Sequence, residues 1–202
     1  MLNASDCYAI FQKSIETYHI HDHVDTLLKN PYPAGSFEAL LFDKNWIDTV
    51  QWHLEDIIRA PEINPTEAVL IKRRIDKSNQ DRTDRVEMVD DFFLDQFKNV
   101  VPKPGARINS ETPAWLLDRM RILLLKIYHM KEQTERNDAS PEHIAKCKGK
   151  LAILLEQKTD MQLAFDELIE DISKGDRRFK VYRQMKMYND ASLNPALYAK
   201  KG

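Results

Sequence analysis

The chain has 202 residues, of which 43% are hydrophobic and 31% are charged, so a buried core must lie beneath a heavily charged surface. Its net charge of −2 argues against general nucleic-acid binding, which needs a basic face. No apolar run approaches the ~20 residues that span a bilayer, which argues against membrane insertion.

The N-terminal segment lacks the basic and apolar regions of a signal peptide. Cys7 and Cys147 have neither a disulfide framework nor a metal-type spacing around them, so both are interpreted as free thiols. We therefore expect a cytoplasmic protein.

Five helices are predicted, because proline and glycine divide the chain into segments in which apolar residues recur with helical spacing. Ser36 is a suitable N-cap for the second helix, and Thr66 opens the third. Thr112 and Ser140 suit the N-caps of the fourth and fifth helices, each followed by a proline that suits the first helical position. Gly175 suits the residue that ends the last helix. The predicted helices cover residues 5–29, 36–59, 66–99, 113–136 and 141–174.

The predicted fold is all-α: one helical domain over residues 1–202. Residues 5–175 form an up-down bundle of about five helices, and residues 176–202 form an extended or partly helical C-terminal arm. The arm is rich in Tyr, Met and Phe but weakly periodic. Because so many aromatic side chains are rarely left in water, we expect the arm to dock on the bundle.

The third predicted helix contains a long polar run over residues 72–85, in which only Ile75 is apolar. Ile75 and Val86 nevertheless keep the same helical phase on the two sides of the run. A loop would be free to lose that phase, so the helix is expected to continue. Asn79 and Arg82 then occupy core-facing positions.

Polar residues also take core-facing positions in two other predicted helices. They are Asp48, Gln51 and Glu55 in the second helix and Lys158 in the fifth. In an up-down bundle, Asp48, Arg82 and Lys158 lie near the midpoints of their helices and therefore at one level. At this level the fourth helix is expected to contribute apolar side chains, namely Leu123, Leu124 and Ile127.

Three interpretations of this polar layer stay open, because an unpaired buried charge costs several kcal/mol. One is a layer of salt bridges, with Asp48 and Glu55 against Arg82 and Lys158, that fixes the register of the helices. Another is a ligand site in which Arg82 and Lys158 grip an anion. In that site Asn79 would orient the anion, and Glu55 or Asp48 would hold a metal or act as base. The last is that long helices overhang their neighbours and leave these residues exposed. The candidate ligand-binding residues are Arg82, Asn79, Lys158, Glu55, Asp48 and Gln51.

A candidate metal site lies in the segment YHIHDHVD, residues 18–25. On a helix His19 and His23 share a face at i, i+4, and Asp22 adjoins them, a spacing that can hold a Zn²⁺-type ion. The sequence favours the alternative, a polar helix end before the turn at residues 31–35, because no cysteine or H-E-x-x-H pattern supports the metal.

Two further histidines, His53 and His129, precede the acidic residues Asp56 and Glu132 by three positions. Di-iron bundles use the reverse order, so we expect each to be a core-edge histidine with a local hydrogen bond. With five glycines far apart, no glycine-rich phosphate loop can form. No cofactor is identified beyond the candidate divalent metal.

Four long strings of the sequence are distinctive: NWIDTVQWHLEDIIR (45–59), KRRIDKSNQDRTD (72–84), TPAWLLDRMRILLLKIYHM (112–130) and YRQMKMYNDASLNPALY (182–198). They resemble an uncharacterised, mostly Bacteroidetes family known as domain of unknown function 4254. The resemblance covers nearly the whole chain. It implies a cytosolic single-domain protein and a loose association with glycosyltransferase genes of lipopolysaccharide assembly. It implies no catalytic residues, because no activity is established for the family.

Two functions are compatible with the sequence. The first is a non-catalytic interaction or scaffold protein that associates with itself or with a protein partner, linked to lipopolysaccharide or glycan assembly. It is preferred because no recognisable catalytic set is present and long helices suit partner surfaces. The second is an enzyme or binder of a small anionic, nucleotide-sugar-like phosphorylated ligand at the polar layer. Whether the chain is an enzyme is left open.

Overall fold

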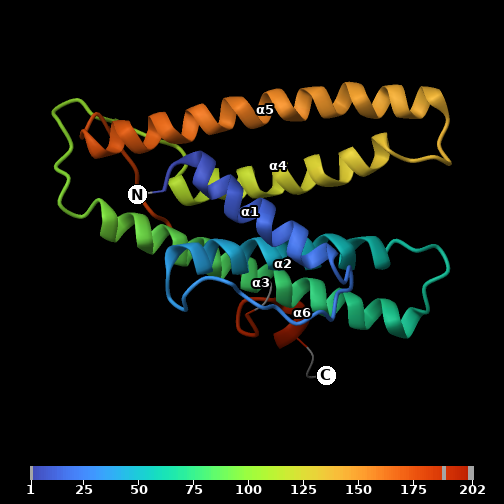
Figure 1. The fold of residues 1–202 in the computed structure, drawn as a ribbon. Coiled ribbons are helices and arrows are strands. Elements are labelled where there is room, and N and C mark those ends of the chain that lie inside the picture. The colour runs from blue at the N-terminus through green and yellow to red at the C-terminus, as the bar shows by residue number, and fades with distance from the viewer. Residues whose placement is uncertain (1, 188–189, 200–202) are drawn as a thin grey trace.

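The computed structural model describes residues 2–187 and 190–199, and in this part of the chain five long helices dominate (Figure 1). The all-α prediction is confirmed. The short elements are a parallel pair of two-residue strands, one before the fourth long helix and one after the fifth, and one turn of helix near the C-terminal end of the described residues. The elements are α1 (Ala4–His19), α2 (Phe37–Ile57), α3 (Pro65–Gln96), β1 (Arg107–Ile108), α4 (Pro113–Thr134), α5 (Pro141–Ser173), β2 (Arg177–Arg178) and α6 (Pro195–Tyr198).

Most helix starts are fixed by the capping residues that the sequence predicts. The side chains of Ser36, Thr112 and Ser140 accept hydrogen bonds from backbone N–H groups in the first turns of α2, α4 and α5. The start of α3 differs from the prediction: Asn64, not Thr66, is its N-cap, because Pro65 takes the first helical position.

The first helix is much shorter than predicted, since α1 ends at His19 rather than near residue 29. Asp22 turns the chain with a left-handed backbone, φ 47°. The following segment runs back to the start of α2, where the side-chain amide of Asn30 donates to the carbonyl oxygen of Ala39 and to Asp43. These long-range bonds hold residues 24–35 in an extended path that helical spacing alone does not reveal.

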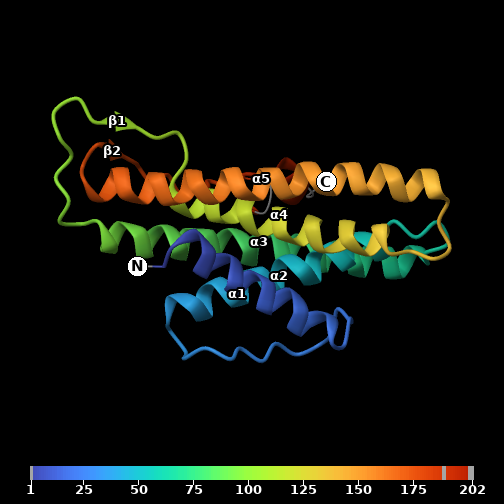
Figure 2. The same cartoon turned by 45° about the horizontal axis from the view of Figure 1, so that its top comes forward.

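The helices α2 to α5 alternate in direction, and α1 crosses α2 and α4 (Figures 1 and 2). The core that they enclose is aromatic and aliphatic, and every long helix contributes fully buried side chains such as Phe11, Phe42, Phe93, Leu117 and Phe165. None of the helices in the described residues is long and apolar enough to cross a membrane.

The segment after α5 lies against the bundle through polar contacts. Gln184 donates its backbone N–H to Glu87 on α3, and Lys186 donates to the carbonyl oxygen of Asn79. Tyr182 and Met185, by contrast, are largely exposed. The reason given for docking, burial of aromatic side chains, therefore does not hold for Tyr182. Residues 188–189 and 200–202 of the predicted arm lie outside the described residues.

Candidate functional site

Three histidines from three helices meet near the end of α1. His19 is the last residue of α1, His53 lies near the end of α2, and His129 lies on α4. Their nearest ring nitrogens all lie within 4.8 Å of one another, and the Nε2 atoms of His19 and His53 are 3.3 Å apart. The cluster thus brings together residues separated by more than a hundred positions in the sequence.

Hydrogen bonds fix which ring nitrogen of two histidines is free. Nδ1 of His19 lies 2.7 Å from the carbonyl oxygen of Ile15, and Nδ1 of His129 lies 2.7 Å from a carboxylate oxygen of Glu132. Because these oxygens only accept, Nδ1 carries the proton in the neutral form of each ring, which leaves the lone pair on Nε2. Nε2 of His129 is buried and has no hydrogen-bond partner among the described residues. Metal-binding histidines are held in this way.

Aromatic side chains fix the planes of all three imidazole rings. Each ring lies against one neighbouring aromatic ring, at a centroid distance between 4.2 and 5.2 Å. This support limits rotation of the ligand side chains, which favours one shared geometry. The pairs are His19 with Tyr128, His53 with Tyr18, and His129 with Trp52.

Asp22 adds a carboxylate to the histidine cluster. One of its oxygens lies 3.6 Å from Nε2 of His53 and 3.9 Å from Nε2 of His19. A tetrahedral ion about 2.0–2.1 Å from each donor spaces its donors about 3.3–3.4 Å apart, close to the 3.3 Å between the Nε2 atoms of His19 and His53. Burial lowers the pKa of His53 and outweighs the attraction of Asp22, which favours the neutral, ligating form of that ring.

The structure brings together two of the three residues of the predicted metal site. His19 and Asp22 belong to the cluster, but His23 does not, because α1 ends at His19 and the i, i+4 relation is lost. The side chain of His23 is 66% exposed and faces Asp25. His53 and His129 were expected only as core-edge histidines; the local bond from His129 to Glu132 exists, yet no sequence spacing signals that both rings face His19.

A second cluster, a buried ion network, joins α2, α3 and α4. Nζ of Lys44 donates to both oxygens of Asp48 at 2.7 Å and lies 2.9 Å from Asp118. Arg121 lies 2.8 Å from Asp118 and 3.5 Å from Asp48, and Nε of Arg82 donates to Asp48 at 2.5 Å. Lys44 and Arg121 are fully buried. The fourth helix therefore contributes Asp118 and Arg121 here, not only the predicted apolar residues.

The network shifts the pKa values of its members. Burial disfavours the charged form of Asp118, but the positive charges of Lys44 and Arg121 outweigh this and hold its pKa well below the usual range. Burial, with help from Arg121, lowers the pKa of Lys44 to about 8, in spite of Asp48 and Asp118. At neutral pH Lys44 and Asp118 are therefore both charged.

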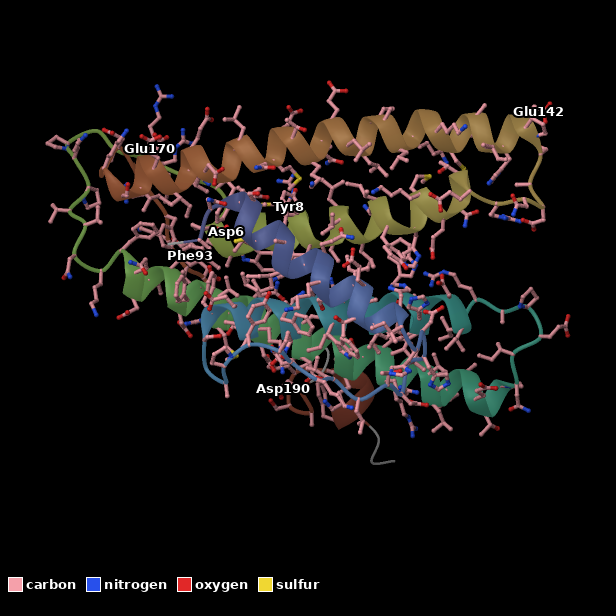
Figure 3. The ribbon with its side chains drawn as sticks, viewed as in Figure 1. Asp6, Tyr8, Phe93, Glu142, Glu170 and Asp190 are labelled. Atoms are coloured by element: carbon pink, nitrogen blue, oxygen red, sulfur yellow. The ribbon has the colours of Figure 1, made fainter. Side chains whose placement is uncertain are left out.

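The other predicted members of the polar layer have separate places. Gln51 donates to Asn79 and accepts from Ser78, both at 2.8 Å. Glu55 pairs with Arg59 one turn along α2. Lys158 does not join the layer: α5 lies on α4 and α1, and Nζ of Lys158 lies 4.9 Å from the ring centroid of Tyr8, which sits between α1 and α5 in Figure 3.

Two neighbouring cavities adjoin the clusters. The larger, about 550 Å³, lies between α2, α4 and α5 and has His129 on its wall. The smaller, about 320 Å³, lies between α2, α3 and α4. Trp52 and Asp56 line both cavities, so the histidine cluster and the ion network border one continuous stretch of α2. The predicted ligand-binding residues that line the smaller cavity are Arg82, Asp48, Gln51 and Glu55.

No curated protein and no solved structure shows significant similarity to the chain. A family model matches residues 38–181, a range that includes His53 and His129, whereas His19 and Asp22 precede it. The match confirms, at the level of the family, the resemblance found in the sequence; the Bacteroidetes origin stays a prediction. The chain therefore belongs to the family described as Protein of unknown function (DUF4254).

Proposed function

We propose that the chain is a metal-dependent hydrolytic enzyme whose centre holds a divalent transition-metal ion on His19, His53 and His129. The observation that carries this proposal is the convergence of three ring nitrogens, two of them with the opposite nitrogen already bonded to an acceptor.

Zinc is the ion that suits these donors best. Imidazole nitrogen is a good ligand for Zn²⁺, and three histidines with one open position form a donor set of catalytic rather than structural zinc sites. The half-buried positions of the three rings would keep the ion at the wall of the 550 Å³ cavity, where His129 lies. A substrate in that cavity would therefore lie beside the ion.

Asp22 is assigned the role of base. It is the most exposed group of the cluster and lies nearest to His53 and His19. A bound zinc ion lowers the pKa of its water ligand to about 7. Asp22 would accept the proton of that water, and the resulting hydroxide would attack a carbonyl or phosphoryl centre. The leaving group then takes the proton from Asp22, so that water is added across the bond that breaks.

Two other roles stay predictions of the sequence. A scaffold or partner protein linked to lipopolysaccharide assembly does not need three convergent histidines. An anion site at the polar layer is less favoured, because Asp48 already pairs with Lys44, Arg82 and Arg121. The smaller cavity also carries more carboxylates than guanidinium groups, which disfavours a phosphorylated ligand there.

Calorimetric titration of tag-free protein with Zn²⁺ tests the proposal. We expect one ion per chain, and a cobalt-substituted sample should give the absorption spectrum of a tetrahedral nitrogen and oxygen site. His129→Ala should weaken binding at least about tenfold. His23→Ala is the matched control, because His23 lies in the same segment as His19 but outside the cluster, and it should bind like the wild type. Equal zinc affinity in the two variants would overturn the proposal.

A further inference from the structure

We propose that the substrate of this centre is an organic phosphate with an apolar body, bound in the 550 Å³ cavity. This inference rests on the metal-dependent function proposed above and names its substrate class. The cavity has the size of a site for a small organic molecule. His129 is the cluster residue on its wall, and Trp52 stacks on the ring of His129, so a ligand in the cavity lies beside the histidine cluster.

The apolar wall of the cavity comes from α2, α4 and α5. Trp52, Met130, Ile153 and Leu154 line it, and the side chain of Ile153 is exposed. An exposed isoleucine facing a concave surface next to a tryptophan is a contact site for an apolar group. Trp52 also holds the ring of His129, with the two rings stacked 4.8 Å apart, so the apolar wall and the metal ligand form one rigid unit.

The basic groups of the cavity are Lys126 on α4 and Lys150 on α5. Within the described part of the chain, neither ammonium group has an ion pair or hydrogen bond, although many other lysines are paired with a carboxylate one turn away. Asp56 is the one carboxylate on the described wall, so the lining has an excess of positive charge. Lysine is a common ligand of phosphate, and the two ammonium groups lie on adjacent helices beside the cluster.

The reaction then follows from the placement of the groups. A zinc ion held by the three histidines would supply Lewis-acid activation. Asp22 would take a proton from the attacking water, whose oxygen would form a bond to phosphorus as the ester P–O bond breaks. The leaving oxygen would take the proton held by Asp22, giving an alcohol and inorganic phosphate. Lys126 and Lys150 would neutralise the charge of the phosphoryl oxygens, while the apolar wall holds the alcohol portion.

Naphthyl phosphate is a suitable probe, with inorganic phosphate and naphthol as its two halves. We expect zinc-loaded protein to bind naphthyl phosphate more tightly than either half and to release phosphate from it. The double variant Lys126→Gln, Lys150→Gln should bind it at least about tenfold more weakly, while its zinc affinity is unchanged. Ile153→Ala should weaken binding of naphthyl phosphate and naphthol but not of inorganic phosphate.

The matched control is the double variant Lys146→Gln, Lys148→Gln, which removes the same charge from exposed positions of α5 outside the cavity. It should behave like the wild type. If zinc binds but naphthyl phosphate does not, or if the two double variants bind it equally, the inference is overturned and the metal centre stands. If naphthoate replaces naphthyl phosphate with equal affinity, phosphate is the wrong anion. If no zinc binds, the proposed function fails and this inference fails with it.

Discussion

Lys44 and Asp48 form an ion pair one helical turn apart inside the core, with Nζ of the lysine 2.7 Å from both carboxylate oxygens. Both side chains are essentially inaccessible to solvent. Asp48 is the centre of the network, because it also contacts Arg82 and Arg121. Each of these cations would be poorly compensated without it, and Arg121 already has an Nη1 group with no hydrogen-bond partner in the described residues.

We therefore predict that Asp48→Asn strongly destabilises the fold. The substitution keeps the volume, but it removes the carboxylate that pairs with Arg82 and leaves the buried Lys44 and Arg121 to share Asp118. We expect a loss of about 3–5 kcal/mol in the free energy of unfolding. Urea denaturation followed by circular dichroism measures it. Glu55→Gln on the same helix breaks a pair with Arg59 at the surface and should cost below ~1 kcal/mol. Similar losses in both variants would mean that the network does not depend on Asp48.

The free energy of unfolding at alkaline pH should depend on the lowered pKa of the buried Lys44. Its pKa is about 8 in the folded protein and 10.5 for an ordinary lysine. Between these values the unfolded chain binds one more proton at this site, so raising the pH favours the folded state. The stability of the wild type relative to Lys44→Met should therefore rise from about pH 8 to pH 10.5.

The comparison with Lys44→Met is needed because tyrosines titrate in a neighbouring pH range, and their ionisation changes the free energy of unfolding in the opposite direction. Burial raises the pKa of Tyr18 to about 12, so above pH 10 its ionisation favours unfolding in both proteins. Urea midpoints at several pH values give the difference. A flat difference from pH 7 to pH 10.5 would show that Lys44 titrates as an exposed lysine does.

The sequence predicts the helices well because their signals are local. Ser36, Thr112 and Ser140 bond to backbone groups within the same turn, and Pro113 and Pro141 fix the first helical residue. Such contacts do not depend on the rest of the fold. The end of α1 is predicted poorly because what holds the returning segment is a set of bonds from Asn30 to α2, and these require the tertiary structure.

The candidate sites were predictable only in part for the same reason. The helical spacing of apolar residues predicted that Asp48 and Arg82 face the core at one level, and the two side chains form an ion pair. It could not reveal Arg121, which directly precedes the apolar run at residues 122–125, because its partners come from α2 and from a neighbouring turn. Nor could phase place Lys158, whose helix faces α1 rather than α3. The histidine cluster needs three helices in register, and each helix alone shows one ordinary histidine.

The hydrogen bond from His129 to Glu132 should tune metal affinity. Glu132 accepts from Nδ1 and so keeps Nε2 available and more basic. Glu132→Ala should lower zinc affinity about 10–100-fold without changing the number of ions bound. Calorimetric titration measures both quantities. Glu135→Ala, at the C-cap of the same helix, removes the same charge away from the ring and should leave affinity unchanged. An equal decrease in both variants would point to a general charge effect instead.

Two glycines should respond in opposite ways to the same substitution. Gly175 follows α5 with φ 74°, and a Cβ there would lie 2.8 Å from the carbonyl oxygen of Val101. Gly175→Ala should therefore cost at least about 1–3 kcal/mol, because it combines left-handed strain with a backbone clash. Gly149 lies inside α5 with nothing within 4 Å of an added Cβ, so Gly149→Ala should stabilise by up to ~1 kcal/mol.

The two glycines differ because Gly175 joins the end of α5 to the segment that precedes α4. Its carbonyl oxygen accepts from Lys103 at 2.9 Å, which holds the segment before α4 against the end of α5 and leads into the pairing of β1 with β2. Thermal unfolding of the two variants beside the wild type tests this. If Gly175→Ala unfolded at the same temperature as the wild type, residues 101–103 would have to lie farther from the end of α5 than the 2.8 Å separation implies.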